Sequence, residues 1–518
     1  MLRRLFEEVA IVVVVLMAGN CMAAPESARP LVLADYYRLV SVQSPAMSPD
    51  GRWVAFIKST VLEAENRRQN ELWLVASDGS APARRLSDPA LNASSPRWSP
   101  SGQLLGFSAR RYDASASNDE ADSIWFLRMD QPKAPPFHVR GVGGLPIFSP
   151  DNKWIAFTRA ATRPKAAQAR SDSDRVIDER FRGHIYEWLN FRADGRGYLP
   201  DPRDPEASPS EELFVVPSAG GDARQLTDFK VNVHGAAWRP DSGALAFTAN
   251  THERDEYIYE RADLFVVSLD GRVKRLTDDG YNRDSPAWSR DGTTIAFRRL
   301  LGLNAVIASR QDHGAPVDIC TIPAEGGAET NVTEKWDLLP GPPAWSSDGR
   351  SIYFSGGTGG DDHLFRVAPE TGVVEQVTQG NRRLSGFSPS ANYATIAYVG
   401  TDSTHPTELF RSAIDGRGEK QLTAFNRDLI QAVRPIEPDQ ISYPSTDGTK
   451  IEGWVLKPRG YDPERQWPLI LTIHGGPHGA FGNDFNFEHQ LFAANGYLVV
   501  YTNPRGSINY GEKFQWAT

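Results

Sequence analysis

This chain of 518 residues has few cysteines, no excess of positive charge and few long apolar runs. It has two cysteines, Cys21 and Cys320. If the N-terminal segment is removed, Cys320 remains alone, which excludes an internal disulfide. A formal net charge of −9 gives no support to nucleic-acid binding. The ten histidines lack metal-ligand spacing: His474 and His478 are four apart, but in a glycine-proline loop and not on a helix. No metal and no cofactor is predicted.

The N-terminus has the pattern of a secretory signal peptide. Arg3 and Arg4 precede the apolar stretch 9–18, and the small residues Ala23 and Ala24 suit cleavage. A membrane-spanning helix needs roughly 20 apolar residues, more than this stretch supplies, so no stable span is predicted once the signal is removed. Residues 1–24 are therefore predicted to direct export, to a periplasm or to the extracellular space.

A turn phrase close to Trp-Ser-Pro-Asp-Gly recurs through the middle of the chain. Its seven copies place their second residue at positions 48, 99, 149, 239, 289, 346 and 388. Proline presets φ, Asp or Ser binds the backbone, and glycine accepts positive φ, so each copy predicts a tight turn. An apolar triplet such as Val54-Ala55-Phe56 follows most copies and predicts the next strand.

Further strands complete each repeat, as in 212–216 and 263–267, and a glycine turn then leads to a short strand such as 225–227. Four short antiparallel strands in roughly 40–50 residues is the pattern of a propeller blade. Seven copies of the turn phrase therefore predict an all-β, seven-bladed propeller over residues 25–425. Cys320 is expected in the core of one of its strands.

The third and fourth copies are 90 residues apart, which predicts an insertion at 161–210. This segment mixes aromatic, charged and proline residues, as binding loops often do. It could contact a substrate or a second domain, or it could be a solvated elaboration. The pair Glu211-Glu212 could bind a peptide amino terminus, but glutamates that open a strand are usually only exposed.

A second domain follows a predicted linker at 426–440. Residues 441–454 indicate two strands around an Asp-Gly turn. The apolar run 468–473 predicts a buried strand, 483–494 a helix capped by Asn483 or Asp484, and 497–501 a second buried strand. A strand, a glycine loop, a helix and a strand form a βαβ unit, so this region is predicted to contain a parallel sheet.

The order of these features resembles the prolyl oligopeptidase family of serine peptidases, with the acylaminoacyl peptidases and bacterial dipeptidyl peptidases as the most similar branches. The resemblance rests on the repeat followed by Asp447-Gly448, the segment His474-Gly475-Gly476-Pro477, and Asn503-Pro504-Arg505-Gly506-Ser507 with Tyr510-Gly511. It implies an α/β-hydrolase domain, of which 441–518 would be the N-terminal part. Its expected substrates are short peptides, cleaved by a Ser-Asp-His triad.

The resemblance also implies roles for single residues. The backbone N–H of Gly476 would help to hold the oxyanion, and Gly475 would shape the turn. His474, Arg505 and Tyr510 would support the site, although Arg505 and Tyr510 could equally brace the loop against the sheet.

The catalytic residues themselves are missing from the matched positions. No Gly-x-Ser-x-Gly occurs in the 518 residues, and the family order places the serine, aspartate and histidine after Thr518. The chain is thus expected to be a fragment that is inactive by itself. A non-catalytic propeller that binds a partner and keeps a hydrolase remnant is the alternative, and a carboxylesterase-like hydrolase is a third. The motifs leave open the choice among dipeptidyl, acylaminoacyl and endo-oligopeptidase specificity, and they do not indicate an oligomeric state.

Overall fold

The computed structural model describes residues 28–88, 90–111, 123–131, 134–138, 145–161, 192–193, 197–198, 209–251, 261–302, 316–476 and 478–517. The predicted signal peptide at 1–24, Pro477 and most of the predicted insertion at 161–210 lie outside the described residues. Strands dominate and helices are few. Within these ranges no helix is long and apolar enough to cross a membrane.

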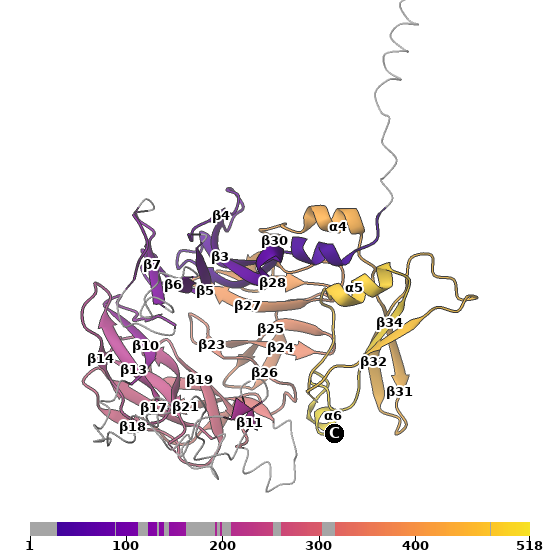
Figure 1. The fold of residues 1–518 in the computed structure, drawn as a ribbon. Coiled ribbons are helices and arrows are strands. Elements are labelled where there is room, and N and C mark those ends of the chain that lie inside the picture. Colours follow the sequence, from indigo (N-terminus) through magenta and orange to yellow (C-terminus); the bar gives the residue numbers. More distant parts are fainter. Residues whose placement is uncertain are drawn as a thin grey trace, which may run out of the picture.

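Four-stranded antiparallel sheets follow one another along the first part of the chain (Figure 1). The first consists of β1 (Ser41–Met47), β2 (Trp53–Leu62), β3 (Arg67–Ala76) and β4 (Arg84–Arg85), with the 3-10 turn η2 (Glu63–Glu65) between β2 and β3. The second consists of β5 (Leu91–Trp98), β6 (Leu104–Arg111), β7 (Ser123–Arg128) and β8 (Phe137–His138). The third consists of β9 (Ile147–Phe148), β10 (Trp154–Ala160), β13 (Glu211–Pro217) and β14 (Arg224–Gln225).

The same unit continues beyond the third sheet. The fourth sheet consists of β15 (Val233–Trp238), β16 (Ala244–Ala249), β17 (Asp263–Ser268) and β18 (Val273–Arg275), and the fifth of β19 (Asn282–Trp288), β20 (Thr294–Leu300), β21 (Val317–Pro323) and β22 (Thr330–Asn331). An eight-stranded sheet then contains β23 (Ala344–Trp345), β24 (Ile352–Thr358), β25 (Asp361–Ala368), β26 (Val373–Gln376), β27 (Arg383–Pro389), β28 (Thr395–Thr401), β29 (Glu408–Ala413) and β30 (Lys420–Gln421). Its two four-stranded halves are joined by one parallel pair, Asp362 with Arg383.

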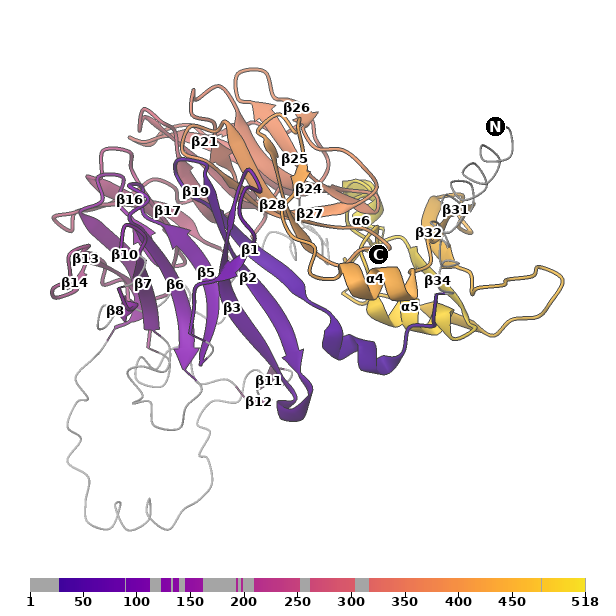
Figure 2. The same ribbon diagram turned by 90° about the horizontal axis from the view of Figure 1, so that it is seen from above.

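Apolar clusters join each of these sheets to the next, and the last of them to the first. Leu72 and Phe107 share a cluster between the first two sheets, for example. Phe56 of β2 packs with Val399 and Leu409 of β28 and β29, so the series closes on itself by packing (Figure 2). The predicted repeat of four-stranded units is present in the described residues, and seven as the number of blades stays a prediction.

The turn phrases owe their geometry to the serine as much as to proline and glycine. Ser48 Oγ accepts from the N–H of Trp53 at 2.9 Å and donates to Asp50 Oδ1 at 2.6 Å. The copies at Ser149, Ser289 and Ser346 repeat these bonds. The last copy was predicted two residues too early, because Ser390 and not Ser388 makes the turn, with Asn392 as its 2.8 Å partner.

The tryptophan that opens many of these phrases links neighbouring sheets. The indole N–H of Trp98 donates to the carbonyl of Ala46 in the preceding sheet at 2.9 Å. Trp238, Trp288 and Trp345 donate in the same way to a carbonyl of the sheet that precedes their own, at 2.8, 3.0 and 3.1 Å. Each indole therefore combines apolar packing with a hydrogen bond across a sheet boundary.

Replacing Trp288 by Phe should test this link. The change removes the bond to the Ala237 carbonyl and leaves a small gap, so we expect a loss of about 1–2 kcal/mol in the free energy of unfolding. Urea unfolding of the variant measures the loss. Trp53→Phe, at a half-buried indole in the first sheet, is the control and should cost less than about 1 kcal/mol. Equal losses in the two variants would show that the bond between sheets contributes nothing.

The C-terminal region forms a separate mixed sheet with the order β31-β32-β34-β33. It contains β31 (Asp439–Pro444), β32 (Lys450–Leu456), β33 (Leu469–Thr472) and β34 (Leu498–Asn503), together with the helices α4 (Arg427–Val433), α5 (Phe487–Ala494) and α6 (Glu512–Gln515). β31 and β32 are the predicted antiparallel pair, and β33 runs parallel to β34, as the βαβ pattern predicts.

The prediction of a buried strand at 468–473 was wrong. β33 lies at the edge of the sheet, and the exposed fractions of Leu469, Leu471 and Ile473 are 58%, 54% and 73%. Ile470 and Thr472 point to the other side and are half-buried. A strand made only of apolar residues is suited to burial on both faces. The composition does not show whether other elements actually cover the strand.

The helix prediction was right in kind but began too early. α5 starts at Phe487, and its N-cap is Asn486, whose side chain accepts from the N–H of His489 at 3.0 Å. Asn483 and Asp484 do not cap the helix. They contact the propeller strands instead: Asn483 Nδ2 donates to Asp361 Oδ1 at 2.8 Å.

Residues near the N-terminus pack against the C-terminal region. The 3-10 helix η1 (Leu33–Arg38) follows Leu31, which shares an apolar cluster with Leu429 and Val433 of α4. The first propeller strand begins only at Ser41, so the predicted propeller start at residue 25 does not coincide with it. The segment predicted as a linker at 426–440 contains α4 and packs in this cluster.

The predicted insertion at 161–210 begins and ends at the same place. Ala160 pairs with Glu211, and the N–H of Ala161 donates to the carbonyl of Ser210 at 2.9 Å, so the excursion extends the connection between β10 and β13. Its described parts, β11 (Arg192–Ala193) and β12 (Gly197–Tyr198), pair with each other. In a propeller, the connections between the second and third strands of all blades lie on one face. The connection between β24 and β25 contacts the C-terminal region, so the insertion begins on the face of the propeller that this region contacts.

Candidate functional site

The segment 474–479, called the His474 loop below, connects β33 to the chain that leads into α5. Gly476 has φ +135°, and a Cβ atom there would lie 2.9 Å from the backbone nitrogen of His478, so only glycine fits without strain. Gly475 differs, because a Cβ atom there would meet open space. Both glycines are exposed. The turn is therefore shaped by Gly476, and the predicted shaping role of Gly475 has no steric basis.

His474 lies at the base of this loop and contacts a serine. Its Nε2 atom is 3.0 Å from Ser507 Oγ, and its ring packs edge-on against Phe481 with centroids 5.3 Å apart. Ser507 is fully buried and donates to the carbonyl of Pro504 at 2.7 Å. A buried hydroxyl that is held by a backbone carbonyl is poorly placed to attack a substrate, so this Ser-His pair is a brace between two loops.

Tyr510 closes a buried polar chain under the His474 loop. Its hydroxyl accepts from Asn503 Nδ2 at 2.7 Å and donates to Glu452 Oε2. Asn503, which is fully buried, also bonds both backbone groups of Phe481, at 2.8 and 2.9 Å. Burial raises the pKa of Tyr510, so the phenol stays protonated. This chain of hydrogen bonds fixes the position of Phe481. The motif 503–507 contains Asn503 but does not indicate this role, and Glu452 belongs to no motif.

Arg505 lies on the outer side of the same region. It forms an ion pair with Asp447, in the turn between β31 and β32, at 2.5 Å. Both side chains are more than one third exposed. The contact thus links two of the motifs that carry the family resemblance, Asp447-Gly448 and 503–507. It corresponds to the interpretation that Arg505 braces the loop.

Residues 480–485, called the interface loop below, follow the His474 loop in the chain and contact the propeller strands. The N–H of Asn483 donates to the carbonyl of Gly360 at 2.8 Å. Arg383 Nη2 donates to the carbonyl of Ala480 at 3.0 Å, and the N–H of Phe485 donates to Thr401 Oγ1 at 3.2 Å. The loop that carries Gly476 is therefore continuous with a segment that contacts the turn between β24 and β25, and residues of β27 and β28.

Acidic side chains gather at this interface around a single arginine. Asp362 and Asp484 lie 3.3 and 3.4 Å from Arg383, and Asp361 accepts from Asn483. Burial raises the pKa of each of these three carboxyl groups, and Arg383 opposes the effect at Asp362 and Asp484. An acid with a raised pKa in the folded state favours folding below its unfolded pKa and loses that contribution as the pH rises through the folded pKa.

We therefore expect Asp362→Asn to gain stability relative to the parent protein as the pH rises from 3 to 7. The expected gain is below about 1 kcal/mol, because the Asp362 side chain is still one third exposed and solvent screens its interactions. Urea midpoints of the two proteins at both pH values measure the difference. Asp484→Asn should change in the same direction. A relative loss of stability at pH 7 in both variants would mean that attraction to Arg383 outweighs burial.

Glu211 and Glu212 do not form an open pair for a peptide amino terminus. Glu212 is fully buried at the start of β13, where it accepts from Thr227 Oγ1 and from the N–H of Lys230, both at 2.7 Å. Glu408 and Thr423 form an equivalent bond at 2.6 Å. The acidic residue near the start of a third strand thus bonds a threonine that lies two residues after the fourth strand, which the single sequence did not reveal.

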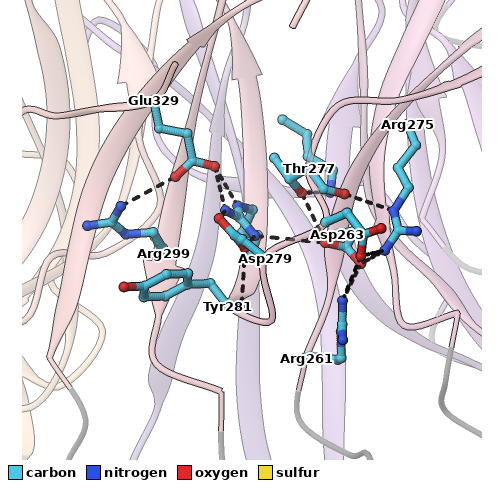
Figure 3. Close-up of polar contacts among 11 residues, drawn as sticks. Arg261, Asp263, Arg275, Thr277, Asp279, Tyr281, Arg299 and Glu329 are labelled. Carbon is cyan, nitrogen blue, oxygen red and sulfur yellow. Dashed lines mark hydrogen bonds and ion pairs between the residues drawn. The ribbon is translucent and has the colours of Figure 1, made fainter. Parts of the chain in front are cut away.

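Charged groups of the fourth and fifth sheets are mutually paired in the same manner (Figure 3). Arg283, which is fully buried in β19, bonds Asp279 at 2.8 and 2.6 Å and Glu329 at 2.8 Å. Asp263 accepts from Thr277 Oγ1 at 3.2 Å and from Arg275 at 2.6 Å. These bonds connect β17 with β18, and β19 with the residue that precedes β22. Cys320, in the neighbouring β21, is buried as predicted, and burial raises the pKa of its thiol to about 12.

No family model matches the chain. Known proteins are similar to it in sequence over most of its length. The uncharacterized peptidase YuxL of Bacillus subtilis is 28% identical over 522 residues, which cover 93% of this chain and 71% of YuxL. Dipeptidyl-peptidase 5 of Porphyromonas gingivalis is 23% identical over 500 residues, which cover 92% of this chain and 68% of that protein.

Solved structures of peptidases share the fold. Pyrococcus horikoshii acylaminoacyl peptidase superposes with a TM-score of 0.68 at 19% identity, over 92% of this chain and 67% of that one. A puromycin-hydrolyzing peptidase of Mycobacterium tuberculosis gives a TM-score of 0.64 at 16% identity, over 96% and 71% of the two chains. The relatives and structural neighbours are peptidases of the prolyl oligopeptidase family. This is the family that the sequence motifs resemble.

Proposed function

We propose that this protein is a serine peptidase of the prolyl oligopeptidase type that cleaves short peptides. The observation that carries the proposal is the His474 loop. It follows a parallel strand, and the φ of one of its two exposed glycines, Gly476, excludes a side chain. Such a loop can bring a backbone N–H to a substrate oxygen, which is the first requirement of an oxyanion hole. The sequence relatives, which are peptidases, support the assignment.

In this proposal Gly476 contributes one oxyanion donor, while His474, Arg505 and Tyr510 maintain the surrounding backbone. The serine, the aspartate and the histidine of the triad would come from sequence that follows Thr518. The absence of Gly-x-Ser-x-Gly from the 518 residues favours this arrangement, as does the buried, carbonyl-bound hydroxyl of Ser507. The exposed apolar side chains of β33 are also suited to packing beneath further elements of a hydrolase sheet.

Short peptides are the proposed substrate class, of the dipeptidyl or acylaminoacyl kind. The named activities of the similar proteins differ in this respect. One relative is a dipeptidyl-peptidase, one structural neighbour is an acylaminoacyl peptidase, and another is an acylaminoacyl peptidase in complex with Z-Gly-Gly-Phe-chloromethyl ketone. The basic start and apolar stretch of the N-terminus support export as part of the proposal.

Chromogenic substrates test the function directly. The protein should be produced both as the 518-residue chain and with the sequence that follows it in the same reading frame. We expect the longer protein to release the chromophore from dipeptidyl or acylaminoacyl substrates and the 518-residue chain to release none. Turnover of simple esters alone by the longer protein would favour a carboxylesterase. A stop codon directly after Thr518 in a verified genome, with no turnover, would favour a propeller that only binds.

A further inference from the structure

We propose that Arg383, a propeller residue on β27, is a positioning residue for the His474 loop. It holds the interface loop in place, so that Gly476 keeps the backbone conformation that an oxyanion donor needs. The inference rests on the proposed function, because positioning Gly476 matters for a rate only if Gly476 serves a reaction. The clamp itself is a property of the fold and can be tested without activity.

Arg383 contacts both sides of the boundary between the propeller strands and the C-terminal region. On the C-terminal side it donates to the carbonyl of Ala480 at 3.0 Å and lies 3.4 Å from Asp484. On its own side it lies 3.3 Å from Asp362 and 3.4 Å from the carbonyl of Gly360. A planar guanidinium has several donors in a fixed arrangement, so one side chain can connect these groups at defined angles.

Glycines allow the two backbones to meet closely beside Arg383. A Cβ atom at Gly482 would lie 2.0 Å from the carbonyl oxygen of Gly360, and one at Gly360 would lie 2.5 Å from the indole of Trp454. The same indole donates to Asn483 Oδ1 at 3.2 Å. The interface loop is therefore held by backbone contact and polar bonds, and its position depends on the propeller strands.

A short path leads from this clamp to Gly476. Ala480, whose carbonyl Arg383 binds, directly follows Gly479, and a Cβ atom at Gly479 would lie 3.1 Å from the His474 ring. Phe481, the next residue, packs its ring against that of His474, and its backbone is bonded by Asn503. Displacement of the interface loop would therefore move both ends of the turn around Gly476.

Hydrogen exchange of the 518-residue chain tests the clamp. Arg383→Ala should increase amide exchange within 474–485 by about tenfold or more, because a charged hydrogen-bond partner of the loop is lost. Arg383→Lys should fall between Arg383→Ala and the parent protein. Arg382→Ala is the matched control, because the neighbouring arginine binds Glu419 within the propeller, at 2.8 and 2.7 Å, and should leave 474–485 unchanged. Exchange in β10 and β13 reports whether each variant is folded.

Kinetics of the longer protein then separate the clamp from the function. We expect Arg383→Ala to lower kcat by about tenfold and to leave KM within about twofold, because the lost alignment affects the transition state. Unchanged exchange in 474–485, or an equal increase in Arg382→Ala, would overturn the clamp. Increased exchange with unchanged kcat would overturn its positioning role. An inactive parent protein would count against the proposed function, while the exchange result would still decide the clamp.

Discussion

Gly476→Ala should lower kcat of the longer protein by about 10²- to 10³-fold, the cost of losing one oxyanion donor. The new methyl group would lie 2.9 Å from the backbone nitrogen of His478 and 3.0 Å from that of Gly479, and φ +135° is unfavourable for any side chain. The loop must therefore change its backbone conformation, which turns the N–H of residue 476 away from the substrate. Steady-state kinetics with a peptide substrate measure the loss.

Gly475→Ala is the matched control for this experiment. The neighbouring glycine is also exposed, but a methyl group there meets no atom within 4 Å, so we expect less than about a threefold change in kcat. The melting temperature of Gly476→Ala should be somewhat lower than that of Gly475→Ala, because its loop must rearrange, but both variants should be folded under the assay conditions. If Gly476→Ala were as active as Gly475→Ala, the His474 loop would have no part in the reaction.

Gly482→Ala should separate the C-terminal region from the propeller strands. A methyl group 2.0 Å from the carbonyl oxygen of Gly360 cannot be accommodated without moving one backbone, and both backbones are held by the bond from Asn483 to Gly360. We expect a cost of about 3 kcal/mol, at the upper end of what overpacking costs, concentrated at this interface.

Limited proteolysis of the 518-residue chain can localise this effect. In Gly482→Ala, cleavage within 426–440 and 474–485 should become about ten times faster, while cleavage within the first three sheets should not change. Gly475→Ala again serves as the control, since it adds a methyl group nearby without a clash. Unchanged cleavage in Gly482→Ala would show that the close approach to Gly360 is not needed for docking.

Much of the fold could be predicted because its signals are local and repeated. The turn phrases encode their own geometry, and the strand pairs of the repeat follow from them. The parallel pairing of β33 and β34 was predictable for the same reason, since a glycine loop and a helix between two apolar strands leave few alternatives. The shift of the last copy from Ser388 to Ser390 shows the limit of this approach, because two serines fit one phrase.

The interactions that join distant segments could not be predicted from one sequence. The run 468–473 looks buried because it is apolar, but burial depends on which elements cover it, and Leu469 and Leu471 are exposed. Asn483 resembles a helix cap until its partner, Asp361, is known, and that residue is 122 positions away. The indole bonds between sheets and the contacts of Arg383 are likewise visible only in three dimensions.

The site was predicted unevenly for the same physical reason. Gly476 could be identified because its motif follows a strand, and its φ agrees with a need for glycine. Among the residues that hold its loop, Glu452 and Arg383 carry no local signal, because an isolated polar residue in a strand is usually only exposed. Asn503 lies in the motif 503–507, but the motif does not show that its side chain bonds the backbone of Phe481. The family resemblance pointed to the His474 loop, and the structure shows which residues hold that loop in place.

The most direct test of the account is to label the longer protein with a serine-directed fluorophosphonate and to map the modified residue by mass spectrometry. We predict one labelled serine, located after Thr518, with labelling slowed strongly by Gly476→Ala and little by Gly475→Ala. A label on Ser507 or on any other serine of the 518 residues would contradict the account. So would the absence of labelling in a protein that hydrolyses peptides.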